Sequence, residues 1–517
     1  MSAARYVLSI GLVMLLTMGA AGPQDAGEAA ERAAAWFESH HDRPTMLRAF
    51  LHRMPKGGDI HTHLSGAVYA ESYIDWAEKE GLCVATATDV LVAPPCHPGD
   101  QPVAEALASS QAYDSFIDRL SVRNVSLSNR SGHDQFFSTF AAFGAISSRH
   151  DDMLAEVSSR AASQHIFYLE TMLSVPSAGL REALDGAQTQ GAFGDGWQED
   201  LAGSHAALLD NGLAQAVAAS STALDTMEQD TRQLMGCDDE SGEADSGCEV
   251  TVRYLQQAIR TAPPEQVFAR LAHGFALARA DGRVVGVNLV APEDDRVSLR
   301  DYRLHMRMLE FLAGKYPHVG IALHAGELTL GLVPPAHLRF HIRGAVETGR
   351  AQRIGHGVDI DFENDALELM AMLKEQDVLV EILLTSNDVI LGVSGNEHPF
   401  PDYLEAGVPV TLATDDEGVS RIDLTNEYLR AATTYGLVYE DLKALARNSL
   451  AYSFLAGNSL WGSTRLFTPV EACADDALGS ASPSPDCHQF LAGSDRAREQ
   501  WRLEAELTEF EKLPWLE

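Results

Sequence analysis

The chain is poor in positive charge. Lysine and arginine together number 38 among 517 residues, against 74 aspartates and glutamates, so the formal net charge at pH 7 is −36. An acidic surface of this kind repels the phosphates of nucleic acids and of anionic membranes. The composition therefore argues against a nucleic-acid partner, and it disfavours a highly phosphorylated ligand unless a local basic pocket receives it.

Long apolar runs are also scarce, and the clearest one, Val7–Met18, is too short to span a bilayer comfortably. It follows Arg5 and precedes the small residues Gly19-Ala20-Ala21. This order is typical of a secretory signal, so we expect a signal peptide over 1–21. The mature protein would then be secreted or periplasmic, without stable membrane association. A retained N-terminal anchor is the alternative.

Cysteines are few, and none has the C-x-x-C spacing of a zinc or redox site. The six fall into three sequential pairs within polar, turn-rich segments. In an oxidising compartment the simplest pairing closes three short loops, although six cysteines allow 15 connectivities. We predict the disulfides Cys83–Cys96, Cys237–Cys248 and Cys473–Cys487 as structural staples.

The rest of the sequence alternates apolar runs with amphipathic segments. We expect buried strands at 56–64, 166–170, 250–255, 284–290, 319–323, 353–356, 378–384 and 408–413. Helical periodicity separates them at 68–80, 104–163, 264–280, 299–315, 336–349, 363–375 and 397–406. Strands that alternate with helices pair in parallel, and nearly continuous apolar strands are buried on both faces. The pattern predicts an α/β fold, a (β/α)8 TIM-type barrel over 56–470 with insertions.

Four other segments are assigned from composition and periodicity. Residues 22–55 are expected to form an N-terminal helical extension. The range 82–103 is read as a disulfide-stapled loop, 175–198 as an irregular insertion, and 199–235 as one long helix. The range 471–517 is expected to hold a disulfide loop and an acidic helix. Its apolar stripe (Trp501, Leu503, Leu507, Phe510) would dock on the body of the protein.

The stretch around Asp59-Ile60-His61-Thr62-His63 organises the candidate site. On a strand, side chains two residues apart point to the same face, so His61 and His63 converge on one point. Two imidazoles held in this way suit zinc or a similar divalent ion. Alone, the pair is weak evidence, because most His-x-His pairs are surface or core histidines.

Polar residues follow several other expected strands, where the active sites of such barrels lie. They are His324-Ala-Gly-Glu327 after the fifth strand, His356-Gly after the sixth, Ser386-Asn387 after the seventh and Thr414-Asp415-Asp416 after the eighth. Each has an ordinary explanation on its own, as a core histidine, a turn residue or a helix cap. Their coincidence with strand ends predicts a metal site.

The ordered motifs resemble those of the adenosine deaminase family. They are His61-Thr-His63-Leu-x-Gly-Ala, His324-Ala-Gly-Glu327, Ile354-Gly-His356-Gly and Thr414-Asp415-Asp416. The family belongs to the metal-dependent amidohydrolases with a (β/α)8 barrel. The resemblance covers roughly residues 50–470. The expected signal peptide and the segment from Ser386-Asn387 to His398-Pro399 look more similar to the secreted, growth-factor-like branch and its bacterial relatives.

The resemblance implies a cofactor and a reaction. One Zn²⁺ ion per chain would be held by His61, His63, His324 and Asp415. The reaction would be hydrolytic deamination of adenosine and 2′-deoxyadenosine at purine C6, giving inosine or deoxyinosine and ammonia. The small-molecule partner would be a purine nucleoside. A homodimer, through residues 24–55, is a further state that the family makes plausible.

The resemblance also assigns the remaining groups. His356 would orient the attacking water and help to deprotonate it, and Asp416 would accept a hydrogen bond from the water or the purine. Glu327 would be the general acid that protonates the neighbouring ring nitrogen, which requires a raised pKa. His63 and Asp416 are also expected to contact substrate.

Two positions depart from the family pattern. Ser65 stands where many members carry an acidic ribose contact, and Ala291 where a glycine offers its backbone N–H to the purine. Both remain candidate substrate contacts. Asn387 and His398 are candidates for steadying the site from behind, with loop hydrogen bonding as the alternative. The aromatic residues Trp76, Phe136, Phe137, Phe140 and Phe143 could line a purine pocket, but we favour the protein core for such a helical stripe.

Three alternatives stay open. The first is the same chemistry on adenine, a nucleotide or a modified nucleoside; Arg119, Arg123 and Arg421 are the candidates for a 5′-phosphate. The second is an extracellular binding or signalling protein on an inactive scaffold, against which the retained Glu327 argues. The third, hydrolysis of amides or esters, is disfavoured by the absence of a bridging lysine at a strand end.

Overall fold

A computed structural model describes residues 23–239, 242 and 244–514. Its centre is one eight-stranded parallel sheet in the order β1-β5-β6-β7-β8-β9-β10-β11. The strands are β1 (Gly57–His63), β5 (Ile166–Leu173), β6 (Thr251–Ile259), β7 (Val284–Val290), β8 (Gly320–Ala325), β9 (Arg353–His356), β10 (Leu379–Ile382) and β11 (Val410–Leu412). The edges meet where His63 N donates to Asp415 O (2.9 Å) and Asp415 N to His61 O (2.9 Å). The fold is the expected (β/α)8 TIM barrel.

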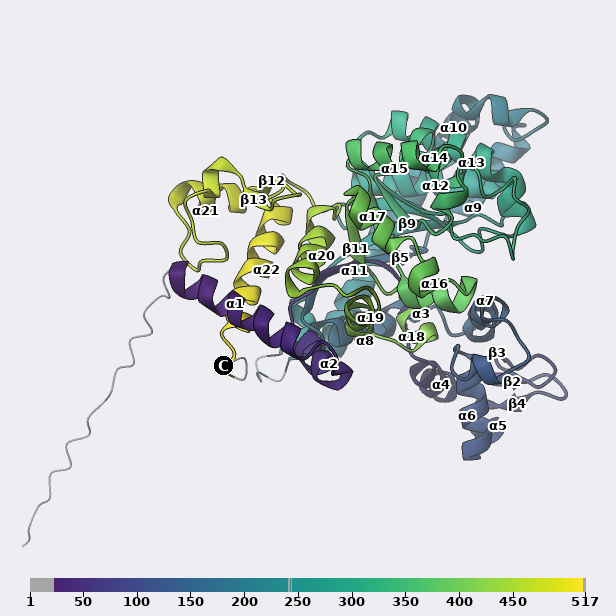
Figure 1. Cartoon of the computed structure of the whole chain (residues 1–517). Coiled ribbons are helices and arrows are strands. Elements are labelled where there is room, and N and C mark those ends of the chain that lie inside the picture. The colour runs from purple at the N-terminus through teal and green to yellow at the C-terminus, as the bar shows by residue number, and fades with distance from the viewer. Residues whose placement is uncertain (1–22, 240–241, 243, 515–517) are drawn as a thin grey trace, which may run out of the picture.

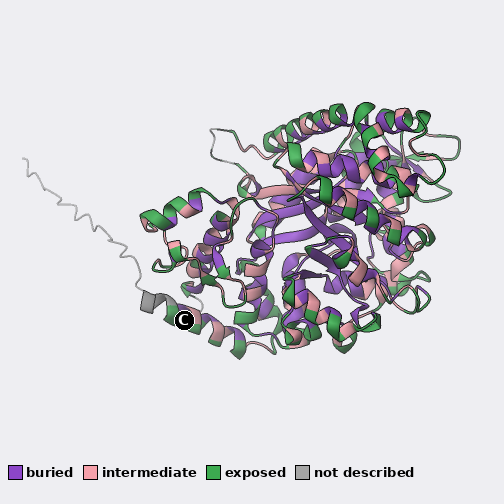
Figure 2. Cartoon of the chain, turned by 90° about the horizontal axis from the view of Figure 1, so that it is seen from above, coloured by how far each residue is buried: buried purple, intermediate pink, exposed green. Residues whose placement is uncertain are grey.

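Most of the barrel strands are largely apolar and covered on both faces, whereas β1 and β6 carry more polar residues. Every residue of β5 and β8 is buried, and so are the short strands β9, β10 and β11. Figure 2 shows the buried strands in the middle of the molecule and the exposed surface on the helices around them. A polar side chain inside such a strand must have a buried partner, since an unpaired polar group there is costly.

Helices surround the barrel and extend it at several connections. They are α1 (Pro23–Ser39), α2 (Pro44–Arg53), α3 (Leu64–Ala67), α4 (Ala70–Lys79), α5 (Val103–Ala106), α6 (Ser110–Arg119), α7 (Gly132–Phe143), α8 (His150–Ser163), α9 (Leu180–Thr189), α10 (Leu201–Asp210), α11 (Leu213–Leu234), α12 (Pro264–Ala280), α13 (Arg296–Lys315), α14 (His341–Glu347), α15 (Ala366–Glu375), α16 (Leu384–Leu391), α17 (Phe400–Ala406), α18 (Glu417–Ser420), α19 (Leu424–Tyr435), α20 (Tyr439–Ala451), α21 (Pro485–Ala492) and α22 (Asp495–Glu511).

Several sequence predictions for the connections were wrong. The range 82–103 is not only a loop, because β2 (Cys83–Ala85), β3 (Val90–Val92) and β4 (Gln101–Pro102) pair in a small antiparallel sheet. The predicted irregular insertion at 175–198 contains helix α9. The predicted helix at 199–235 is two helices, because Gly212 has a φ of +109° and ends the first. The strand expected at 378–384 ends at Ile382, and α16 begins at Leu384.

The N-terminal and C-terminal helices pack together on the barrel. Helices α1 and α22 lie side by side and both contact α20 (Figure 1). Phe37 and Phe50 of the N-terminal pair join Phe510 of α22 in the main hydrophobic cluster. The apolar stripe of α22 is buried, so the expectation that it docks on the body is confirmed. A small hairpin, β12 (Trp461–Ser463) and β13 (Thr468–Pro469), lies between α20 and α21.

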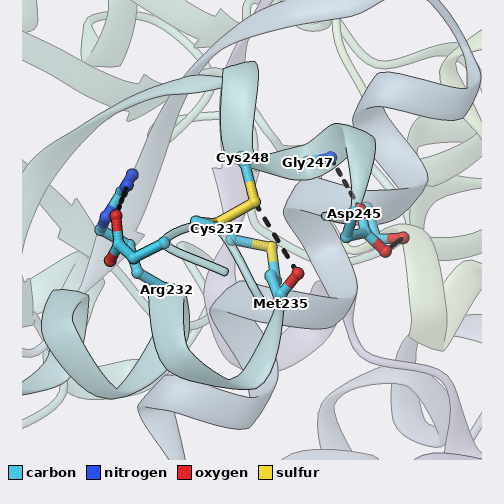
Figure 3. The surroundings of a disulfide bond; sticks show 8 residues. Arg232, Met235, Cys237, Asp245, Gly247 and Cys248 are labelled. Atoms are coloured by element: carbon cyan, nitrogen blue, oxygen red, sulfur yellow. Dashed lines mark hydrogen bonds and ion pairs between the residues drawn. A yellow bond between two sulfur atoms is a disulfide. The ribbon is translucent and has the colours of Figure 1, made fainter. Parts of the chain in front are cut away.

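The three predicted disulfides are all present: Cys83–Cys96, Cys237–Cys248 and Cys473–Cys487. Figure 3 shows the second, which joins the end of α11 to the turn before β6. In that turn Asp245 accepts a hydrogen bond from Gly247 N (2.7 Å). The bridged cysteines are 11 to 14 residues apart in sequence, so each disulfide restrains one short local loop.

Among the described helices, none has both the length and the apolar content needed to cross a membrane. The predicted signal peptide, 1–21, lies outside the described residues. The division into 1–21, 22–55, 56–470 and 471–517 stays a prediction.

Candidate active site

A pocket of about 280 Å³ opens at the carboxyl ends of the barrel strands. Its walls come from β1, β6, β7, β8, the segment after β11, and helix α7. The lining residues are His63, Ser65, Phe136, Phe137, Phe140, Gln257, Ile259, Val290, Ala291, Pro292, His324, Glu327, Asp415 and Asp416. Most of the predicted site residues therefore share one cavity.

Four of these predicted residues converge closely enough to hold one metal ion: His61, His63, His324 and Asp415. The Nε2 atoms of His63 and His324 are 3.1 Å apart. Asp415 Oδ1 lies 3.5 Å from His61 Nε2 and 3.3 Å from His63 Nε2. Three imidazoles and one carboxylate are a donor set that suits zinc and related divalent ions.

The orientation of the imidazoles supports this fit. His61 Nδ1 is 2.5 Å from Glu381 Oε2, and His324 Nδ1 is 2.9 Å from the side-chain oxygen of Asn288. An acceptor at Nδ1 fixes the proton on that nitrogen and leaves the Nε2 lone pair free. The Nε2 atom of His61 is buried and has no hydrogen-bond partner in the protein. A cation would satisfy it.

The partner of His61 belongs to a column of buried charges inside the barrel. Glu381 Oε1 is 2.7 Å from Arg353 Nε, and Arg353 Nη1 is 2.6 Å from Glu170 Oε2. Glu170 Oε1 in turn accepts a hydrogen bond from Phe454 N (2.5 Å), beyond α20. The three ionisable side chains are all at most 1% exposed. The candidate metal ligand is thus tied through three side chains to the chain segment that follows α20.

The carboxylate of Asp415 is held from the side opposite the histidines. Ser386 Oγ, at the start of α16, donates to Asp415 Oδ2 (2.7 Å). This bond leaves Oδ1 directed at the histidines. Asp415 also has a φ of +62°, a left-handed conformation that it shares with His356 (+70°) and Ala291 (+83°). Such conformations are rare for residues other than glycine, and they cluster where a site demands a particular direction.

Two carboxyl groups face the cavity in an environment that favours their protonated forms. Burial, and then the charge of Asp415, raise the pKa of Glu327 well above its usual range. Burial and Asp415 raise the pKa of Asp416 in the same way. Asp416 lies so close to Gly66 that a Cβ there would be 1.4 Å from Asp416 Oδ1, so position 66 admits only glycine. Protonated carboxyl groups at a ligand cavity can donate protons.

A hydrogen-bonded chain fixes the orientation of His356. Its Nδ1 is 2.8 Å from Asn387 Nδ2, and Asn387 Oδ1 is 2.9 Å from His398 Nε2. Because the amide nitrogen donates to Nδ1, the neutral ring carries its proton on Nε2. Burial lowers the pKa of His356 to about 3, which keeps the ring neutral. The contacts expected of Asn387 and His398 behind the site are present.

The two doubtful substrate positions and part of the aromatic stripe line the cavity. Ser65 and Ala291 are wall residues, although no contact tests their roles. The preference for a core role was wrong for Phe137 and Phe140, which are only partly buried and line the pocket, whereas Phe136 belongs to the buried core and also borders the pocket. Trp76 and Phe143 are core residues, each packed against Tyr73. Helical periodicity identified the stripe but could not tell which of its members faces the barrel mouth.

The three arginines considered for a phosphate lie elsewhere. Arg421 pairs with Glu71 (2.8 Å), Arg123 with Asp118 (2.5 Å), and Arg119 bonds to Ser138. Within the described parts of the chain, no lysine or arginine lines the active-site pocket. The pocket therefore offers carboxylates, histidines and aromatic rings, and it lacks the charge that a phosphate needs.

Sequence reasoning missed several residues of the site. Glu381 and Asn288 hold the ligand histidines, and Glu293 bonds to the backbone beside Glu327. A usable signal existed for the first two, because each is the lone polar residue in a buried apolar strand (Val-Glu-Ile and Val-Asn-Leu). For Glu293, in a connection rich in acidic residues, no pattern marked it out.

Comparison with known proteins identifies related chains. Residues 223–460 match the family model described as adenosine deaminase. The chain is 39% identical over 139 residues to the adenosine deaminase of Enterococcus faecalis, an alignment covering 27% of this chain and 38% of that enzyme. It is 31% identical over 214 residues to the N6-methyl-AMP deaminase of Danio rerio, covering 40% of this chain and 57% of that protein. These matches span well under two thirds of the relatives' own lengths.

One solved structure covers more of the chain. The apo N6-methyl-AMP deaminase of Arabidopsis thaliana superposes with a TM-score of 0.50 at 21% identity, covering 79% of this chain and 94% of the other. At that identity the likeness establishes the fold.

Proposed function

Because the chain belongs to the adenosine deaminase family, we propose that it hydrolyses adenosine and 2′-deoxyadenosine to inosine or deoxyinosine, releasing ammonia. The observation that carries the proposal is the convergence, at one end of an apolar pocket, of four side chains that could hold a metal ion and two carboxyl groups whose pKa burial raises. His61, His63, His324 and Asp415 would hold the ion, for which zinc is the proposed identity. When bound, it supplies the Lewis acidity that makes water a nucleophile near neutral pH.

The protein's own groups supply the remaining chemistry. His356 is neutral, and its Nδ1 accepts a hydrogen bond from Asn387, so its proton is on Nε2 and this N–H orients the attacking water. Glu327 donates its proton to the purine nitrogen next to C6, which prevents negative charge from accumulating in the ring. Asp416 hydrogen-bonds to the water or to the purine and keeps the attack on one face. The proton that water loses on attack is returned to the exocyclic amine, and collapse of the tetrahedral adduct then expels ammonia.

Substrate class is argued from the walls of the pocket. Phe136, Phe137 and Phe140 offer aromatic surface for the purine, and Ser65 and Gln257 offer hydrogen bonds for a sugar. The carboxylates and the absence of a lining cation favour an uncharged nucleoside over a nucleotide. A secreted or periplasmic enzyme that removes extracellular nucleosides fits this preference, and that location remains part of the proposal.

The test is ultraviolet absorbance of adenosine incubated with the purified, metal-loaded protein. We expect conversion to the inosine spectrum, and we expect the Glu327→Gln variant to bind metal and inosine but to lose turnover by about 10³-fold. Adenine, AMP and N6-methyl-AMP are assayed in parallel. Faster turnover of AMP than of adenosine would reject the nucleoside assignment. If the metal-loaded wild-type protein converts none of these substrates, the proposal of a deaminase is rejected.

A further inference from the structure

Glu293 is a buried carboxylate directly behind the proposed general acid. It stands in the connection between β7 and α13 and is 1% exposed. Its Oε2 accepts a hydrogen bond from Glu327 N (2.9 Å), and its Oε1 accepts one from Gly326 N (3.3 Å). It also bonds to His341 Nδ1 (2.6 Å) through Oε1, and Arg260 Nη1 lies 4.0 Å from Oε2.

The charge of Glu293 is retained despite its burial. Burial acts to raise the pKa of this carboxyl, but the hydrogen bond from His341 and the charges of His341 and Arg260 hold it below the usual range. A buried anion is costly unless several donors compensate for it. Two of the donors that Glu293 uses are consecutive backbone N–H groups of the loop that carries Glu327. The Glu293 carboxylate is therefore bonded directly to the backbone of that loop.

The loop has no other means of fixing these N–H groups. Strand β8 ends at Ala325, so the amides of Gly326 and Glu327 have no strand partner. Gly326 has a φ of +76°, and a Cβ there would meet Asp359 Oδ1 at 2.5 Å. The opposite edge of the loop is fixed, since Gly326 O accepts from Val358 N (2.8 Å) and Asp359 N (3.2 Å). Glu293 completes the attachment on the amide side.

We propose that Glu293 is the positioning residue of the proposed general acid: its carboxylate clamps the Gly326-Glu327 amides and thereby aims the Glu327 carboxyl group at the substrate. This role rests on the proposed deamination. Glu293 does not itself line the pocket or contact the donor atoms of the metal ligands, and it reaches the cavity only through its hydrogen bonds to the Gly326-Glu327 backbone, so its effect on turnover passes through Glu327. A displacement of about 1 Å of such a group can lower turnover by about 100-fold.

The decisive variant is Glu293→Gln, which keeps the length of the side chain but replaces one accepting oxygen with a donor. With adenosine we expect kcat to fall by about 100-fold, while KM, the affinity for inosine and the metal content stay within threefold of wild type. In the Glu327→Gln background the same substitution should lower kcat no further, because residues that act as a unit are non-additive.

Glu363 supplies a matched control. It is also buried, and its Oε1 accepts from two consecutive amides, Ile342 N (2.6 Å) and Arg343 N (3.2 Å), at the start of α14. Glu363→Gln should lower the melting temperature comparably and leave kcat within twofold of wild type. Equal losses of kcat in the two variants would mean that Glu293 acts through general stability, and would overturn the proposal.

Hydrogen exchange separates this proposal from the proposed function. Peptides that contain the amides of Gly326 and Glu327 should exchange at least tenfold faster in Glu293→Gln, but not in Glu363→Gln. Unchanged exchange, or unchanged kcat in a folded, metal-loaded Glu293→Gln enzyme, overturns the role of Glu293. If the wild type deaminates no aminopurine, the proposed function fails and the catalytic role of Glu293 fails with it, even where faster exchange shows that the clamp on the loop is real.

Discussion

Two walls of the same pocket are built in different ways. The floor consists of side chains at strand ends, and its donor atoms are fixed by buried partners on neighbouring strands, such as Glu381 for His61. The cover is helix α7, which lies in the long connection between β1 and β5 and presents Phe137 and Phe140 to the cavity. The cover is tied to the barrel by the contact of His133 Nε2 with Asp294 Oδ1 (3.1 Å).

We expect the strand-end floor to determine the chemistry and the α7 cover to determine which substrate binds. Strands of a closed barrel cannot shift without breaking the sheet, so groups at their ends keep the geometry that metal binding and proton transfer require. A connection can change its length and side chains at small cost to the fold. We therefore expect substitutions on the floor to act on metal affinity and kcat, and substitutions on the cover to act mainly on KM.

The largest effect is expected from removing a ligand on the floor. His61→Ala should release the metal and lower turnover by about 10³-fold or more, because Lewis-acid activation is worth several kcal/mol. Metal content and adenosine turnover measure this. His273→Gln is the control, since His273 is also buried but bonds to Ser220 Oγ (2.9 Å). A His61→Ala enzyme with full metal content and turnover would remove His61 from the site.

The next effect concerns the partner of that ligand. Glu381→Gln should weaken metal affinity by about 10- to 100-fold, as loss of such partners does elsewhere, while turnover at saturating metal recovers. Competition with a chromophoric chelator gives the affinity. Glu170→Gln removes the other anion on Arg353 without touching His61, and it should change the affinity less. If metal affinity fell equally in the two variants, the loss would be due to the disturbed Arg353 and not to the missing hydrogen bond to His61.

A smaller effect is expected on the cover. Phe137→Ala should raise KM for adenosine by about 10-fold with kcat nearly unchanged, since stacking of a base on an aromatic ring contributes about 1–3 kcal/mol. Phe143→Leu, on the same helix but stacked on Tyr73 in the core, should lower thermal stability and leave KM unaltered. A fall in kcat without a rise in KM for Phe137→Ala would contradict the division between floor and cover.

The smallest effect is a pH dependence of the cover. The hydrogen bond to Asp294 raises the pKa of His133 above its ordinary value. A raised pKa means that the protonated pair stabilises the docked helix at low pH, and that this contribution is lost as pH rises through the His133 pKa. We expect KM for adenosine to rise by two- to fivefold across that range, and not in His133→Gln. An identical profile in that variant would exclude the pair as the cause.

The sequence was informative about the floor for a physical reason. Barrel strands are apolar runs, so a polar residue at the end of a run, such as His324 or Asp415, stands out and has a known direction. The pocket-lining role of helix α7 was not predicted, because an aromatic stripe on a helix has the same period whether it faces the core or a cavity. The strands of the 82–103 sheet are too short to show a period, and Gly212 looked like a tolerated helix residue. Residues such as Glu293 bond to backbone, which leaves no sequence pattern.

The column from His61 through Glu381, Arg353 and Glu170 to Phe454 has a consequence for descent. The four side chains come from four strands, and replacing one of the three charged ones leaves a buried charge unpaired, which costs about 3–5 kcal/mol. Phe454 contributes only its backbone N–H. Recombination that draws part of this set from a divergent parent would yield unstable offspring. Exchanges of whole surface connections, such as the stapled 82–103 range, leave the set intact. Substitutions should therefore accumulate in the connections around the mouth of the barrel. The buried charged residues inside the barrel should be inherited together.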